Sequence, residues 1–131
     1  MSKNIIAFIL VSACFLSCKK QPGEGGFASI EGKVYVKNYD ASYTILTAEH
    51  YLPGETVYII YGDGTEIGNT VKTSYDGSFK FNYLRKGKYK VYVLGEDSTQ
   101  PYKSIPKEEL VEVTITEKKQ KKVLEDFVII K

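Results

Sequence analysis

The chain has 131 residues, a length that suits a single domain. Its 18 basic and 16 acidic side chains nearly balance, which argues against nucleic acid as a partner because such partners select a strongly basic face. One histidine and two cysteines are too few for a zinc site or a disulfide framework.

Residues 1–17 are predicted to be a bacterial lipoprotein signal peptide. Lys3 gives a positive start, and the apolar run 5–16 has signal-peptide length and is short for a membrane span. The run ends in Phe15-Leu16-Ser17-Cys18, which resembles a lipobox. The resemblance implies that Cys18 becomes the new N-terminus and carries diacylglycerol and palmitate, as a membrane anchor and not a redox group.

Two alternatives to this leader stay open. Residues 11–14 end in Cys14 and also fit the lipobox, but cleavage there would shorten the apolar run to 5–10, so we prefer Cys18. An ordinary secretory signal or an uncleaved N-terminal helix is less consistent with a cysteine followed by two lysines. Lys19 stands where an aspartate is associated with inner-membrane retention, so the resemblance implies the outer membrane.

Residues 18–27 are expected to hold the lipidated cysteine and a flexible tether, because Lys-Lys-Gln-Pro-Gly-Glu-Gly-Gly at 19–26 contains no apolar residue. Residues 28–131 are expected to form one domain. Strand signals follow in order at 28–36, 55–61, 67–73, 78–82, 88–93, 109–116 and 123–130. The polar strand 67–73 is predicted to be an edge.

Residues 73–94 are the clearest element, a β-hairpin with one buried face. Phe79 and Phe81 alternate with polar residues in its first strand, and Tyr89, Val91 and Val93 do so in its second. Such a hairpin needs other strands to cover it. With no convincing helical period elsewhere, the sequence predicts an all-β fold, a seven-stranded Greek-key β-sandwich, with a small barrel as the alternative.

Four short motifs in order carry a family resemblance: Gly-Lys-Val at 32–34, Leu-Pro-Gly-Glu-Thr-Val at 52–57, Asp-Gly-Ser-Phe-Lys-Phe at 76–81, and Gly-Lys-Tyr-Lys-Val at 87–91. They resemble the carboxypeptidase regulatory-like domains, prealbumin-like sandwiches akin to transthyretin and to the collagen-adhesin B-type repeats. The resemblance covers residues 30–94. It implies a prealbumin-like fold and a non-catalytic accessory role, although fold analogy does not supply a function.

The chain departs from this family at three points, one of which is Glu55 in place of the family's alanine. The turn before Phe79 has Asp76 but lacks the family's preceding acid, so we expect no cation there. The connection 38–51 is far longer than the family's usual one. Lys33 and Asp126 are the one pair that fits the internal isopeptide bond of the adhesin relatives, and two solvated side chains are the simpler interpretation.

No catalytic motif stands out. His50 is the only histidine and follows no nucleophile pattern, so we expect a loop residue and no enzyme. Gly62-Asp63-Gly64 is not a phosphate loop, because neither a GK[ST] sequence nor a helix follows it. We expect no cofactor and no metal.

Alternating strands would place loops 38–54, 74–77 and 95–108 at one end of the sandwich. That end would present a candidate binding face, namely Tyr39, Tyr43, His50, Tyr51, Tyr75 and Tyr102. The opposite end, beside the tether, would hold what we call the basic end: Arg85, Lys86, Lys118, Lys119, Lys121 and Lys122. We expect the basic end to face anionic headgroups, although tyrosines that cap a core and solvated lysines would give the same pattern.

The sequence therefore favours a cell-envelope lipoprotein whose sandwich has a structural or protein-interaction role. Its expected partners are the membrane, through the lipid anchor, and a protein of the envelope. The alternative is a ligand-binding module that recognises a glycan or a peptide through loop 38–54. The absence of tryptophan weakens the glycan version, because sugar platforms favour large aromatic faces.

Overall fold

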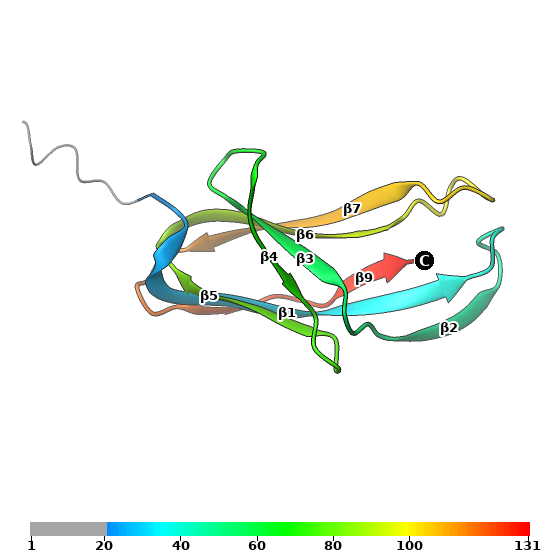
Figure 1. Cartoon of the computed structure of the whole chain (residues 1–131), viewed down its shortest axis with the longest axis horizontal. Coiled ribbons are helices and arrows are strands. Elements are labelled where there is room, and N and C mark those ends of the chain that lie inside the picture. The colour runs from blue at the N-terminus through cyan, green and yellow to red at the C-terminus, as the bar shows by residue number, and fades with distance from the viewer. Residues whose placement is uncertain (1–20) are drawn as a thin grey trace, which may run out of the picture.

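The computed structural model describes residues 21–131, which form two packed β-sheets and no helix (Figure 1). Cys18 and the predicted leader lie outside the described residues. The all-β sandwich is confirmed, with nine strands where seven were predicted. The strands are β1 (Glu24–Tyr39), β2 (Leu46–Tyr51), β3 (Thr56–Tyr61), β4 (Ile67–Lys72), β5 (Ser78–Leu84), β6 (Gly87–Glu96), β7 (Pro106–Ile115), β8 (Lys121–Val123) and β9 (Phe127–Ile130).

The first sheet is organised by β1, which has 16 residues and pairs with four other strands. β5 and β2 follow one another along one edge of β1, where the Val34 N–H donates to Gly77 O and its carbonyl accepts from Leu52 N, both at 2.9 Å. β8 and β9 follow one another along the other edge, and both are parallel to β1. β1 is therefore long enough to pair with two successive strands along each of its edges.

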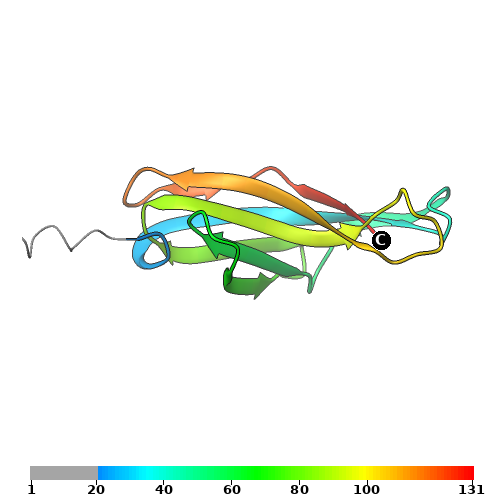
Figure 2. The ribbon, with the colours of Figure 1, turned by 90° about the horizontal axis from the view of Figure 1, so that it is seen from above.

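The second sheet has the order β4-β3-β6-β7 and is antiparallel throughout. β6 and β7 form a long hairpin whose register runs from Gly87 opposite Ile115 to Glu96 opposite Pro106. β4 is an edge strand, as its polar sequence predicts. Figure 2 shows the two sheets as layers of an elongated body.

The core lies between the two sheets. The predicted hairpin 73–94 was wrong as a pairing, because β5 pairs with β1 in the first sheet and β6 pairs with β3 and β7 in the second. Phe79, Phe81, Tyr89, Val91 and Val93 are all buried, which confirms the face that alternation predicts. Their partners from the other strands are Ile30, Val34, Val36, Val57, Ile59, Val113, Ile115, Phe127 and Ile129. Apolar side chains from both sheets thus cover the buried faces of β5 and β6.

Two strands lie where the sequence predicts loops. β2 falls within the predicted loop 38–54, and all six of its side chains are exposed. A strand with no covered face has no reason to alternate apolar and polar residues. β8 begins at Lys121, within the predicted charged turn 117–122, and its three residues are also exposed. Periodicity cannot detect either strand.

The start of the domain also differs from expectation. β1 begins at Glu24, four residues before the predicted boundary, so part of the predicted tether belongs to the sheet. The buried Tyr89 hydroxyl accepts a hydrogen bond from Gly23 N at 2.9 Å and donates one to Arg85 O at 2.6 Å. Arg85 N in turn donates to Gly23 O at 2.9 Å. Backbone hydrogen bonds, which need no apolar side chain, hold this glycine-rich segment.

Tyr89→Phe should lower the free energy of unfolding by about 1–3 kcal/mol, because it leaves Gly23 N–H and Arg85 C=O without their partner. The measurement is urea unfolding, with Tyr75→Phe as the control since Tyr75 is 91% exposed. Amides 23–27 should also exchange faster in Tyr89→Phe. Equal stability of the two variants would show that the hydroxyl does not hold this segment.

Candidate functional site

The turns 40–45 and 97–105 meet at the end of the molecule farthest from the point where the chain enters the fold (Figures 1 and 2). The Tyr43 hydroxyl donates to Glu96 Oε2 at 2.7 Å and to Lys103 O at 2.9 Å. Tyr102 N donates to Ala41 O at 2.7 Å. These bonds join one turn from each sheet, and we call residues 40–46 and 96–105 the distal tip.

Each turn of the distal tip is fixed internally by an aspartate. The Asp40 carboxylate accepts hydrogen bonds from Ser42 Oγ, Thr44 N and Ile45 N. The Ser42 bond, followed by the backbone bonds, lowers the pKa of Asp40 below its usual value. Asp97 accepts bonds from Thr99 Oγ1, Thr99 N and Gln100 in the same way, which lowers its pKa. The tip is an ordered surface with two ionised carboxylates.

Two tyrosines of the distal tip have left-handed backbones. Tyr43 has φ 55° and Tyr102 has φ 61°. A bulky residue adopts this conformation at a cost of about 1–3 kcal/mol, and it persists where surrounding contacts impose it. Here the hydrogen bonds between the two turns impose it. The result turns one ring inward, to Glu96, and leaves the other 79% exposed.

Apolar side chains are exposed beside these tyrosines. Ile45 is 62% exposed and Leu46 is 44% exposed. Ile45 ends the turn whose Ala41 carbonyl accepts the bond from Tyr102, and Leu46 begins β2 directly after it. Sequence reasoning missed both because it searched loop 38–54 for aromatic residues. Their signal was present, since a loop that only connects strands has no need of adjacent isoleucine and leucine.

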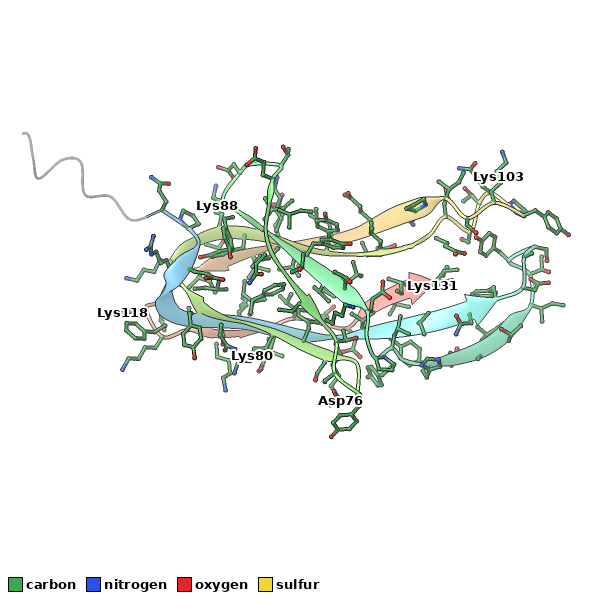
Figure 3. All side chains as sticks on the ribbon, viewed as in Figure 1. Asp76, Lys80, Lys88, Lys103, Lys118 and Lys131 are labelled. Atoms are coloured by element: carbon green, nitrogen blue, oxygen red, sulfur yellow. The ribbon has the colours of Figure 1, made fainter. Side chains whose placement is uncertain are left out.

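The six candidate residues do not form one face. Three of them belong to the distal tip or to the end of β1 beside it, namely Tyr39, Tyr43 and Tyr102. His50 and Tyr51 lie on β2, where the His50 ring bonds the Tyr51 carbonyl oxygen at 2.8 Å. Tyr75 lies in the turn before β5, and Figure 3 shows its neighbour Asp76 far from Lys103 of the tip. The prediction that loop 74–77 lies with the tip was wrong, because β5 pairs with the first half of β1 and β2 pairs with the second half. The turn before β5 therefore lies beside the middle of β1.

Tyr51 is the centre of a second cluster, on the outer face of the first sheet. Its ring contacts Tyr35 edge-on at 5.2 Å, and Lys33 Nζ lies 5.0 Å from its centroid. Its hydroxyl donates to Asp126 at 2.7 Å, and this bond raises the pKa of Tyr51. Lys33 and Asp126 thus both contact Tyr51, an arrangement that suits ordinary polar side chains.

The turn 74–77 is held by Asp76. Its carboxylate accepts bonds from Ser78 Oγ at 2.6 Å and Ser74 Oγ at 2.7 Å, and these bonds hold the pKa of Asp76 well below its usual range. Gly77 has φ 79°, and a Cβ there would lie 2.9 Å from both Tyr51 Cβ and Val34 O. The turn is therefore a structural joint between β5 and β2. The Asp76 Oδ1 accepts the bonds from both serines.

None of the six candidates lines either of two hollows of the surface, although the larger one adjoins Tyr51 through Lys33 and Asp126. An open groove of about 690 Å³ is lined by parts of β1, β4, β5 and the β8–β9 connection, with Lys33, Lys80 and Asp126 among its polar side chains. A smaller hollow of about 120 Å³ lies beside Gly62 and Lys88. Neither is lined by a residue of the distal tip. The distal tip is therefore not part of the wall of either hollow.

Within residues 21–131 no group of three or more histidine, cysteine, aspartate and glutamate side chains is placed to hold a metal ion. The same residues include no helix long and apolar enough to cross a membrane.

Comparison with known proteins shows a distant structural similarity. No protein-family model matches the chain, and no curated protein matches it. The crystal structure of a "putative carbohydrate binding protein" from Pseudomonas aeruginosa is similar, with a TM-score of 0.44 and 14% identity over 88% of this chain and 94% of that one. The carboxypeptidase regulatory-like assignment stays a prediction from the four motifs.

Proposed function

We propose that this chain is a cell-envelope lipoprotein, anchored by Cys18, whose sandwich is a non-catalytic binding module. The distal tip is the surface that contacts its partner, a protein of the envelope. The outer membrane is its proposed location, on the lipobox resemblance and on Lys19 after the anchor.

The observation that carries this proposal is the opposite placement of the chain's entry and the distal tip. Gly23 is held at one end by Tyr89, five residues after the proposed anchor. The longest connections of both sheets meet at the other end and are joined by Tyr43 and Tyr102. A lipid-anchored module of this form would present its tip away from the membrane (Figure 1).

The composition of the tip favours a protein partner. Exposed Ile45, Leu46 and Tyr102 offer apolar area, and ionised Asp40 and Asp97 lie beside them. Apolar and aromatic centres with a polar rim are typical of protein interfaces. β2 adds an exposed strand edge with unpaired backbone groups, which an extended segment of a partner could pair with.

The alternative is a ligand-binding module for a glycan or a peptide. The open groove of about 690 Å³ is large enough for such a ligand. No residue of loop 38–54 lines it, but Lys33 and Asp126 of its lining contact Tyr51, so this alternative moves the site to the border of that loop.

The double variant Ile45→Ala/Tyr102→Ala tests the tip. Truncation of exposed anchors should weaken partner binding by at least about tenfold and change stability by less than about 0.5 kcal/mol. The measurement is recovery of envelope proteins crosslinked in cells to the tagged lipoprotein, at equal abundance. The matched control is Ile67→Ala/Tyr75→Ala, which removes two exposed side chains outside the tip. Equal recovery with both variants would refute the tip as the binding surface.

A further inference from the structure

The end of the sandwich where the chain enters the fold carries exposed aromatic rings among lysines. Phe27 is 64% exposed and Tyr83 is 72% exposed. Ala28 on β1 is paired with Leu84 on β5, so each ring lies one residue from this buried pair. We call Phe27, Tyr83 and the six residues of the basic end the anchor-end face.

The two rings are turned outward by local structure. Phe27 precedes Ala28, which is buried, so strand alternation directs the phenyl ring away from the core. Tyr83 has φ 60° at a point where the β1–β5 register shifts, a left-handed conformation that costs a tyrosine energy. Neither ring joins the core cluster, so folding alone gives no reason for apolar area at these positions.

Basic side chains surround the rings. Lys118 Nζ lies 5.4 Å from the centroid of Phe27. Lys121 is opposite Ser29 in the β1–β8 register, and Arg85 N bonds the carbonyl of Gly23. The acids at this end are Glu24, which accepts a bond from Asn69, Glu117, and Asp63 and Glu66 of the β3–β4 turn beside Lys88, so the six basic residues are in excess of four acids. Figure 3 places Lys118 at the end where the chain enters the fold.

Covalent geometry limits how far this face can lie from the anchor. Tyr89 fixes Gly23, and Cys18 is five residues earlier. Five residues span at most about 18 Å when fully extended. A lipidated Cys18 would therefore hold the basic end within reach of the headgroups, where attraction acts over a Debye length of about 8–10 Å.

We propose that the anchor-end face docks on an anionic phospholipid bilayer, with Phe27 and Tyr83 at the level of the headgroups. The docking rests on the Cys18 anchor proposed above and adds an orientation, since it points the distal tip away from the membrane. Aromatic rings favour the membrane–water interface, and lysines favour anionic lipid. A second copy of the chain fits this face poorly, because two basic ends repel one another.

The test uses tryptophan as a probe, since the chain contains none. The mature lipidated protein carrying Phe27→Trp is placed in vesicles of phosphatidylethanolamine with 30% phosphatidylglycerol, or of phosphatidylcholine alone. Tyr102→Trp, at the distal tip, is the matched control. We expect the emission of Trp at position 27 to shift to the blue and to be quenched by brominated lipid in the anionic vesicles, with no change at position 102. The proposal is overturned if Trp at position 27 emits like a water-exposed tryptophan in both kinds of vesicle.

A second arm separates the face from the anchor. The mature chain from residue 18 with Cys18→Ser keeps every described residue, and it should sediment with the anionic vesicles in a salt-sensitive way. Lys118→Gln/Lys121→Gln should lower this binding about fivefold for each lysine, whereas Lys103→Gln/Lys107→Gln at the distal end should leave it unchanged. Equal loss with both pairs, or no binding of the unlipidated chain, would contradict docking whatever the state of Cys18.

Discussion

Replacing Cys18 by serine is expected to abolish palmitate labelling of the protein. The sulfur of Cys18 is the atom to which diacylglycerol would be attached, and serine cannot form the thioether. The leader should then stay on the chain, so the protein should also migrate at a higher mass than the processed form. Labelled palmitate followed by immunoprecipitation measures the first effect, and globomycin treatment of the unmutated protein should reproduce the second.

Cys14→Ser is the matched control for this experiment. Cys14 lies four residues before Cys18 and ends the competing lipobox-like sequence. We expect Cys14→Ser to keep both labelling and processing. The opposite pattern, with labelling lost only in Cys14→Ser, would move the anchor to Cys14. Labelling that survives in both single variants and in the double variant would remove the lipoprotein proposal itself.

Phe79→Ala is expected to lower the free energy of unfolding by about 3–5 kcal/mol, a large part of the stability of a domain of this size. Phe79 is 4% exposed, and its ring lies 6.1 Å from that of Phe81 and 5.9 Å from that of Phe127. A Cβ on Gly32 would come 2.9 Å from the Phe79 ring, so the backbone of β1 packs directly on it. Removing the ring opens a cavity between three strands that cannot move together to fill it.

Phe27→Ala provides the control for Phe79→Ala, because it removes the same side chain from a position that is 64% exposed. Its effect on the unfolding free energy should stay within about 0.5 kcal/mol. Urea unfolding of both variants makes the comparison. Similar losses in the two variants would mean that Phe79 of β5 is not at the centre of the core.

The buried faces of β5 and β6 were the part of the fold that the sequence predicted best, although the two strands lie in different sheets and do not form the predicted hairpin. Phe79, Phe81, Tyr89 and Val91 alternate with polar residues because one face of their strands is buried, and the structure buries each of them. The edge position of β4 follows from its polar sequence for the converse reason. Period-two alternation reports burial of one face, so strands that bury one face are the ones it can find.

The features that the sequence missed lack such a buried face or depend on pairing. β2 exposes Leu46 and Tyr51 on both of its sides, so its residues resemble a loop. The turn at Asp76 was assigned to the distal tip because strands that alternate in direction were expected to return to the same end of the sandwich. The length of β1 is visible only in its pairing with both β2 and β5. The structure therefore confirms that Tyr43 and Tyr102 are neighbours, whereas the predicted place of Tyr75 beside them was wrong.

The exposed apolar residues of the distal tip and of the anchor-end face were not found for a similar reason. Ile45 and Phe27 look like ordinary core residues in a sequence, and both are more than 60% exposed in the structure. Only the fold shows that they lie at opposite ends of the molecule.

Site-specific photo-crosslinking in cells tests most directly whether the distal tip binds a partner. A photoreactive amino acid is placed in turn at Ile45, at Tyr102 and, as a control, at exposed Thr65 in the β3–β4 turn. The proposed function predicts that positions 45 and 102 give an adduct of the same mass with one envelope protein, and that position 65 does not. An adduct shared by all three positions, or none from positions 45 and 102, would contradict it.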